Sequence, residues 1–255
     1  MKNQFLTALP AFLLALSGIL SAAAQDTGQP SGNKSTFKGK LVLQDLVPPD
    51  DRKFELAEDL EYIDPKGVHW YARSGLIFDG ASIPRALWAV VGSPYTGTYR
   101  RAAVMHDFYC THLYRLWQDV HRMFYDAMIS DGTNPFRAKL MYYAVYRFGP
   151  RWDLEEIKTC PDNVACAKPG DIQVQKFTPE LDEHEAIAEL ERVKAELIKD
   201  DTTTLTELET LARAEPTIPY NQSSERFSDN WPDAMNRQKS PHYVAPEAEP
   251  LQDVP

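Results

Sequence analysis

Two short stretches of the sequence carry acid–base side chains that could form one site. Adjacent His106 and Asp107 stand in "AAVMHDFYC", and Asp79 stands in "DGASIPRALW". On a helix, His106 and Asp107 would adjoin small or apolar residues, so both are expected to be at least half-buried. A buried carboxylate needs a partner, because an unpaired one costs several kcal/mol. We therefore predict that the turn containing Asp79 and Ser82, or an arginine just upstream of His106, lies within hydrogen-bonding reach of this helix.

The predicted catalytic residues are His106, Asp107 and Asp79, with a carboxylate-held His106 as the general base that activates water. His121 lies at the edge of the apolar stripe of the next predicted helix, where a tight link would bring it opposite His106. Because neutral imidazoles and carboxylates bind hydrolytic metal ions, His106, Asp107 and His121 are also candidate ligands of a divalent metal. The competing interpretation is structural, since a His–Asp pair can simply clamp two elements together. Cys110 is interpreted as a small buried hydrophobe.

Strands are predicted in the first part of the chain. Residues 39–46 alternate between apolar and polar side chains, which is typical of a half-buried strand. Residues 53–64 and 68–75 flank "PKG", a tight-turn sequence, and predict a hairpin. "LIFDGAS" adds a short strand that runs into a glycine turn. We expect a small antiparallel sheet of three or four strands.

Helices are predicted after the strands. "PRALWAVVG" is typical of a short helix that Gly92 ends, and two longer helices contain "AAVMHDFYC" and "DVHRMFYDAM". The third long helix has Asn134 as its cap, Pro135 in its first turn and Gly149-Pro150 as its end. Short links make neighbouring helices antiparallel. The expected fold class is α+β: a small antiparallel sheet followed by a three-helix bundle, then an acidic helical hairpin and a disordered tail.

The chain changes character after residue 152. Ala186, Leu190, Val193 and Leu197 recur at helical spacing, so residues 180–214 predict a helical hairpin whose apolar stripe is covered by the core domain or by a protein partner. From Pro216 onward Pro, Ser, Asn and Asp dominate, which predicts disorder. The expected domains are a signal peptide at 1–24, a linker at 25–37, an α+β core at 38–152, a disulfide loop with the acidic hairpin at 153–215, and a disordered tail at 216–255.

The first residues predict export. An apolar run from Phe5 to Leu20 follows one lysine, and Ala22-Ala23-Ala24 fits the small-residue cleavage rule of signal peptides. The run is shorter than the ~20 residues of a spanning helix, so no membrane span is expected in the mature chain, which would be periplasmic or secreted. In that oxidising compartment Cys160 and Cys166 are expected to form a disulfide. The net charge of −10 argues against nucleic-acid binding, which needs a basic face.

Four blocks in a fixed order resemble a known family: "DGASIPRALWAVVGSP", "YRRAAVMHDFYC", "DVHRMFYDAM" and "AKLMYYAVYRFGPRW". They are similar to the phage and bacterial family called domain of unknown function thirteen fifty-three, over roughly residues 38–152. The resemblance implies no established activity, but the phage origin of many members implies work near the cell envelope. Members often have Asp at the position of His121, an exchange that suits a ligand or proton carrier. "HDFYC" also resembles the catalytic helix of secreted phospholipase A2, although the cysteine framework and calcium loop of that family are absent here.

The predicted function is hydrolysis of a peptidoglycan bond or a lipid ester in the cell envelope. The alternative is a non-enzymatic envelope or prophage-derived binding module that recruits an envelope component or a protein partner through residues 180–214. The two hypotheses differ in one structural respect. An enzyme of the predicted kind needs the His106 imidazole open to solvent in a concave site. A module would bury that imidazole and expose an apolar patch on the hairpin instead.

Overall fold

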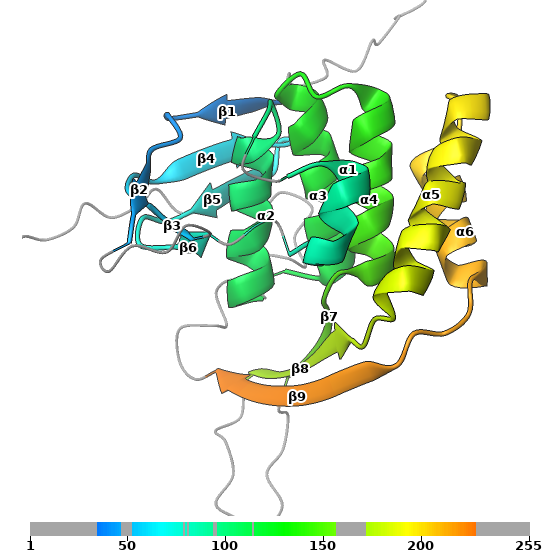
Figure 1. The fold of residues 1–255 in the computed structure, drawn as a ribbon. Coiled ribbons are helices and arrows are strands. Elements are labelled where there is room, and N and C mark those ends of the chain that lie inside the picture. Colours follow the sequence, from blue (N-terminus) through cyan, green and yellow to red (C-terminus); the bar gives the residue numbers. More distant parts are fainter. Residues whose placement is uncertain are drawn as a thin grey trace, which may run out of the picture. The chain divides into compact units, whose positions relative to one another are not determined.

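Two three-stranded antiparallel sheets form the first part of the fold in the computed structural model (Figure 1). The structure describes residues 35–46, 53–78, 80, 82–93, 96–113, 115–156 and 172–227. The first sheet has the order β1-β4-β5, with β1 at Thr36–Lys38, β4 at Leu60–Ile63 and β5 at His69–Ala72. The second has the order β2-β3-β6, with β2 at Leu43–Asp45, β3 at Phe54–Leu56 and β6 at Ile77–Phe78. The expectation of one small sheet was therefore wrong in number, and β1 begins inside the predicted linker.

The β4–β5 hairpin is the one that the "PKG" turn predicts. The Asp64 carboxylate accepts hydrogen bonds from the backbone amides of Lys66 and Val68, at 2.8 and 2.9 Å, and so closes the turn. Its second oxygen accepts from the Trp70 indole at 3.2 Å. Asp64 is buried, and these three donors replace the water that the carboxylate loses. The hairpin presents Tyr62 to the core, on the side where β5 contacts the first long helix.

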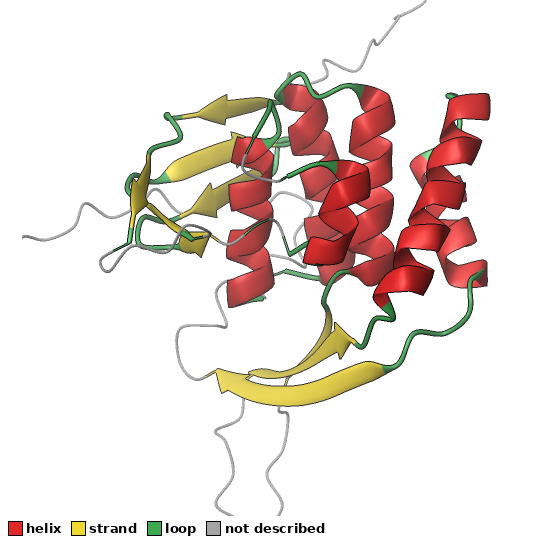
Figure 2. Ribbon diagram, in the orientation of Figure 1, coloured by secondary structure: helices red, strands yellow, loops and turns green. Residues whose placement is uncertain are grey.

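Three long helices form the bundle that the sequence predicts (Figure 2). They are α2 at Arg100–His112, α3 at Trp117–Ser130 and α4 at Pro135–Phe148, and α3 packs against both of its neighbours. Asn134 caps α4 by accepting a hydrogen bond from the Phe136 amide at 2.9 Å. A 3-10 turn at Arg85–Leu87 (η1) and α1 at Trp88–Val91 precede them, and Gly92 ends α1 with a φ of 97° that favours glycine. The α+β fold class is confirmed.

The acidic hairpin packs on the core. It consists of α5 at Glu183–Lys199 and α6 at Leu205–Ala214, and both helices contact α4. The predicted stripe residues Ala186, Leu190, Val193 and Leu197 are all buried. The sequence predicted that either the core domain or a protein partner covers this stripe. The structure shows the core domain in that place, so the stripe is not available to a protein partner.

A third antiparallel sheet, β7-β8-β9, is not predicted by the sequence. It joins β7 at Arg151–Glu156, β8 at Ile172–Pro179 and β9 at Tyr220–Phe227. The core boundary predicted at residue 152 therefore falls inside β7. The prediction of disorder from residue 216 onward is wrong for Tyr220–Phe227, which form β9. The predicted signal peptide and the Cys160–Cys166 disulfide lie outside the described residues, so both stay predictions.

Truncation after Glu215 is expected to destabilise the chain. The truncated chain loses β9 and also the Pro216 carbonyl, which accepts a hydrogen bond from Arg147 at 2.6 Å. We expect the midpoint of thermal unfolding to fall by roughly 5 °C or more, since about 1 kcal/mol corresponds to 2–4 °C in a domain of this size. A chain that ends after Phe227 is the matched control. Equal melting temperatures for the two truncated chains would show that β9 adds nothing to the stability of the fold.

Candidate functional site

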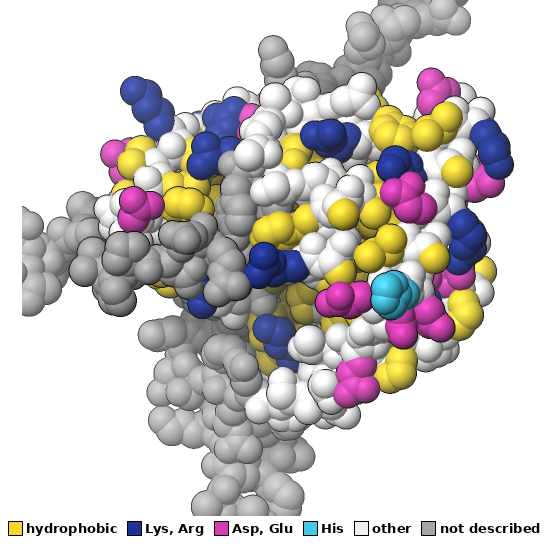
Figure 3. Space-filling view, in the orientation of Figure 1, with side chains coloured by type: hydrophobic (Ala, Val, Ile, Leu, Met, Phe, Trp, Pro, Cys, Tyr) yellow, Lys and Arg dark blue, Asp and Glu magenta, His cyan; other side chains and the backbone are white. Residues whose placement is uncertain are grey.

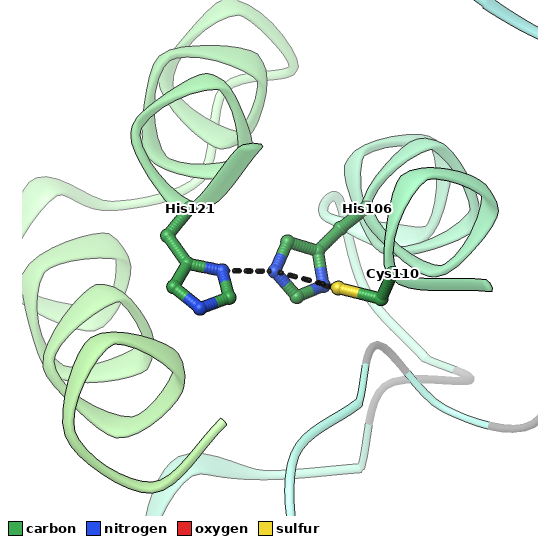
Figure 4. Close-up of side chains that lie close together, drawn as sticks. All are labelled: His106, Cys110 and His121. Carbon is green, nitrogen blue, oxygen red and sulfur yellow. Dashed lines mark hydrogen bonds between the residues drawn. The ribbon is translucent and has the colours of Figure 1, made fainter. Parts of the chain in front are cut away.

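His106 on α2 and His121 on α3 face each other inside the helix bundle (Figure 4). The Nε2 atom of His106 lies 2.8 Å from the Nδ1 atom of His121, and the two rings are stacked with centroids 5.0 Å apart. Both side chains are fully buried. The prediction that a tight antiparallel link brings these two imidazoles together is confirmed.

Cys110 completes this group. It follows His106 by one helical turn, and its Sγ lies 3.7 Å from each ring nitrogen of His106 (Figure 4). The donor atoms of His106, Cys110 and His121 all lie within 4.8 Å of one another. We call these three residues the His–Cys–His cluster. Its residue types and spacing could hold a metal ion, with Cys110 in the place where the sequence suggested Asp107. The i, i+4 spacing of His106 and Cys110 was the signal that could have identified it.

Burial keeps His121 and Cys110 uncharged. Loss of solvent lowers the pKa of His121 well below its usual value of 6.5, and the neighbouring His106 lowers it further. The Pro150 carbonyl opposes this shift, but the His121 Nε2 atom makes no hydrogen bond within the described part of the chain. Burial also raises the pKa of the Cys110 thiol, and the nearby negative charge of Asp107 raises it further. His121 is therefore an uncharged imidazole and Cys110 a protonated thiol at neutral pH.

Asp107 points to a different place from its neighbour His106. Its two carboxylate oxygens accept hydrogen bonds from the Gly80 amide, at 3.0 Å, and from the Ser82 hydroxyl, at 2.9 Å. This confirms that the "DGASIP" turn and the "MHDFYC" helix meet in space. Asp79 itself lies outside the described residues. The turn is further held by Trp88, whose indole donates to the Ile83 carbonyl at 3.0 Å.

The arginines just upstream of His106 have other surroundings than the sequence suggested. Arg101 forms an ion pair with Asp131, at the far end of α3, and its guanidinium lies over the Phe37 ring. The Nε atom of Arg100 is buried and makes no hydrogen bond within the described residues. Among the contacts of the described residues, neither arginine pairs with Asp107, and the hydrogen bonds seen for its carboxylate come from the turn.

Ser82 stands out in this turn for its backbone. It has a φ of 53°, in the left-handed region that residues other than glycine rarely adopt. Such strain persists only where the surroundings enforce it, and it is often found at functional sites. Here the hydrogen bond from the Ser82 hydroxyl to the buried Asp107 carboxylate contributes to that enforcement. The sequence indicated Ser82 as part of the turn that partners the helix, but the positive φ of a serine cannot be read from its residue type.

Ser82 also lines a pocket of about 470 Å³, which we call the Ser82 pocket. Its lining includes Ser82, Arg85, Trp88, Phe148, Lys176 and Thr178. Apolar and basic side chains adjoin on the face between α1 and β9, as the space-filling view shows (Figure 3). The pocket therefore combines two hydroxyls, two cations and apolar walls, which is the composition expected of a site for a small anionic and partly apolar ligand.

His106 does not line the Ser82 pocket and is fully buried. A general base must come within hydrogen-bonding reach of the proton that it removes, and in this conformation His106 has no access to a substrate or to bulk water. The predicted role of His106 as the water-activating base is therefore not supported by its position. Asp107 is equally buried, but its carboxylate contacts Ser82, which does line the pocket.

Within the described residues, no helix combines the length and the apolar character that crossing a membrane requires.

Comparison with known proteins finds a family and two bacterial relatives to which this chain is similar. Residues 54–145 match a family described as protein of unknown function (DUF1353). The uncharacterized protein y4iH of Sinorhizobium fredii is 37% identical over 213 residues, which cover 79% of this chain and 89% of the relative. The uncharacterized protein y4jT of the same organism is 43% identical over 102 residues, or 40% of this chain and 30% of the relative. No solved structure matches significantly. The chain therefore belongs to the DUF1353 family, as its four sequence blocks suggest.

Proposed function

We propose that this chain is an exported hydrolase whose reaction takes place in the Ser82 pocket, with Ser82 as nucleophile and Asp107 as its base. The observation that carries the proposal is the strained Ser82, which lines the pocket and donates its hydroxyl to a buried carboxylate at 2.9 Å. A serine hydroxyl is a weak nucleophile until an adjacent base accepts its proton. The export half of the proposal rests on the signal-peptide pattern of residues 1–24.

The reaction would proceed through an acyl-serine. The Ser82 oxygen attacks the acyl carbon, and its proton passes to Asp107 and then to the leaving group. Water then hydrolyses the acyl-serine and restores the hydroxyl. The negative charge that develops on the acyl oxygen needs a stabilising partner, and Lys176 and Arg85 are the cationic side chains in the pocket.

The pocket favours a substrate with an acyl bond close to an anionic group. Trp88 and Phe148 supply apolar walls, and the Arg85 guanidinium lies 5.5 Å from the Trp88 ring centroid, which positions a cation at the edge of the apolar wall. Lipid esters with a phosphate headgroup and peptidoglycan peptides with free carboxylates share this chemistry. Both substrate classes follow from the sequence analysis, and the experiment below distinguishes them.

The test compares turnover by the wild type and by Ser82→Gly. Anionic phospholipid vesicles, purified peptidoglycan and a chromogenic ester are offered separately, so that the substrate class is read from the arm that reacts. Ser82→Gly removes the hydroxyl but suits the positive φ, so the fold should lose only about 1 kcal/mol. We expect turnover to fall by about 10³-fold or more, as when other catalytic serines are lost.

Thr178→Ala is the matched control, because Thr178 contributes an exposed hydroxyl to the same pocket and has no contact with Asp107 in the described structure. It should retain turnover. An active-site fluorophosphonate should also modify Ser82, which mass spectrometry of the digested chain would locate. No turnover in any arm together with no adduct on Ser82 would overturn the proposal.

The burial of His106 favours a second candidate function, the non-enzymatic envelope module. In that case the Asp107–Ser82 contact is only a clamp, and the Ser82 pocket is a binding site for an anionic envelope component. The partner would not bind through the stripe of the acidic hairpin, since α4 covers it. This candidate predicts that the wild type and Ser82→Gly bind anionic vesicles or peptidoglycan equally well and hydrolyse neither.

A further inference from the structure

The His–Cys–His cluster has no part in the proposed hydrolysis, yet it concentrates three metal-ligating side chains in the core. His106 and Cys110 come from one face of α2, and His121 comes from the facing side of α3 (Figure 4). An aromatic shell surrounds them: the ring centroids of Phe124 and His106 are 4.7 Å apart, and those of Trp117 and His121 are 5.5 Å apart. Apolar packing alone does not require two imidazoles and a thiol at this point.

Two of the three separations between donor atoms can be compared with those of a tetrahedral metal centre, and the third is below 4.8 Å. With metal–nitrogen bonds of about 2.0 Å and metal–sulfur bonds of about 2.3 Å, a tetrahedral ion holds nitrogen and sulfur about 3.6 Å apart and two nitrogens about 3.3 Å apart. The observed distance from Cys110 Sγ to His106 Nε2 is 3.7 Å. The two imidazole nitrogens are 2.8 Å apart and would have to separate by roughly half an ångström. Cys110 Sγ also lies 3.7 Å from His106 Nδ1, so the His106 ring or the Cys110 side chain must rotate as well before Nε2 and Sγ can bind the same ion.

We propose that the His–Cys–His cluster binds one transition-metal ion of borderline or soft character, such as Zn²⁺, through His106 Nε2, Cys110 Sγ and His121 Nδ1. Imidazole and thiolate select such ions, whereas Ca²⁺ and Mg²⁺ require oxygen ligands. The nearest acidic residue in the sequence, Asp107, uses its carboxylate on the Gly80–Ser82 turn instead. On binding, the sulfur–hydrogen bond of Cys110 is replaced by a sulfur–metal bond and the proton leaves to solvent.

A metal ion held in this way would join α2 to α3. Asp107, which binds the Gly80 amide, lies on α2. The link between α2 and α3 contains Arg115, whose carbonyl accepts a hydrogen bond from the Trp152 indole at 2.7 Å. Because the ligands are brought together only in the folded chain, metal binding would stabilise the fold by mass action. The centre is buried and distinct from the Ser82 pocket, so its role would be structural rather than catalytic.

The test uses the full chain with Cys160→Ser and Cys166→Ser, so that Cys110 is the only thiol. Co²⁺ and Zn²⁺ are added separately, to the folded protein and also during refolding, because the site is buried. We expect Co²⁺ to give thiolate-to-metal charge-transfer absorption that saturates at one equivalent, and Zn²⁺ to displace it. Zn²⁺ should also raise the melting temperature, and a chelator should reverse the rise.

Cys110→Ser should abolish the charge-transfer absorption, and His121→Gln should weaken Zn²⁺ binding at least 10-fold. His112→Gln is the matched control, because His112 lies on the same helix but bonds the Phe108 carbonyl at 2.8 Å, outside the cluster. It should bind metal like the parent chain. No stoichiometric Zn²⁺ and no charge-transfer band in the parent chain, under either way of adding metal, would overturn the proposal whether or not the variants fold. A parent chain that binds Zn²⁺ but hydrolyses none of the substrates would instead refute only the hydrolase proposal.

Discussion

Glu189→Ala is expected to lower the free energy of unfolding by about 3–5 kcal/mol, because it leaves the buried Arg147 without its oppositely charged partner. The Glu189 carboxylate accepts from the Arg147 Nε atom at 2.9 Å and from the Tyr143 hydroxyl at 2.6 Å, and all three side chains are buried. Burial and the adjacent carboxylate raise the pKa of Tyr143, so its hydroxyl remains a donor. Without Glu189, the hydrogen-bond acceptor that the described residues still offer the guanidinium is the Pro216 carbonyl, which does not neutralise its charge. Urea unfolding of the wild type and the variant measures the difference.

Two controls distinguish the cost of leaving the Arg147 charge unpaired in the core from the simple loss of an ion pair. The double variant Glu189→Leu with Arg147→Met replaces both charges by apolar side chains of similar size, and we expect it to be markedly more stable than Glu189→Ala. Glu196→Ala breaks an exposed pair with Lys199, where both side chains are about two-thirds exposed, and should cost about 0.5 kcal/mol or less. If Glu189→Ala were as mild as Glu196→Ala, the buried ion pair would contribute little to the stability of the fold.

The elements that the sequence predicted well are those with local signals. The bounds of α4 follow from the Asn134 cap, Pro135 and Gly149, all of which act within one turn of the helix end. The sheet β7-β8-β9 was missed because its pairing is not local. The sequence of β9, "YNQSSERF", has no apolar alternation, and residues 221–224 are exposed, so only its register with β8, more than 40 residues earlier, makes it a strand.

The candidate site was predictable to the extent that helix geometry decides it. The short link between α2 and α3 placed His121 opposite His106, as the structure shows. The sequence left two partners open for Asp107, the Ser82 turn and an upstream arginine, and the choice between them depends on where other carboxylates lie. Asp131, at the end of α3, forms an ion pair with Arg101. Asp107 instead accepts a hydrogen bond from Ser82 in the turn. This choice connects Asp107 to the pocket.

Asp107→Ala is expected to destabilise the fold by about 3–5 kcal/mol. The change removes two charge-assisted hydrogen bonds, each worth about 1.5–3 kcal/mol, and leaves the Gly80 amide without this acceptor in a buried position. The strained φ of Ser82 would then lack one of the contacts that enforce it. Thermal and urea unfolding give the loss directly. A change below 1 kcal/mol would mean that the turn is held by other contacts.

Asp107→Asn distinguishes the clamp from the catalytic base. An asparagine is almost the same size, can still accept from the Gly80 amide, and can donate to the Ser82 oxygen, so it should cost only about 1–2 kcal/mol. The asparagine side chain cannot accept the Ser82 proton, because a neutral amide is not a base at neutral pH. If Asp107 is the base, turnover should fall about 10³-fold in a variant that remains folded, and the adduct on Ser82 should form more slowly. If Asp107 is only a clamp, turnover should follow the small change in stability, and a folded, fully active Asp107→Asn protein would remove Asp107 from the reaction.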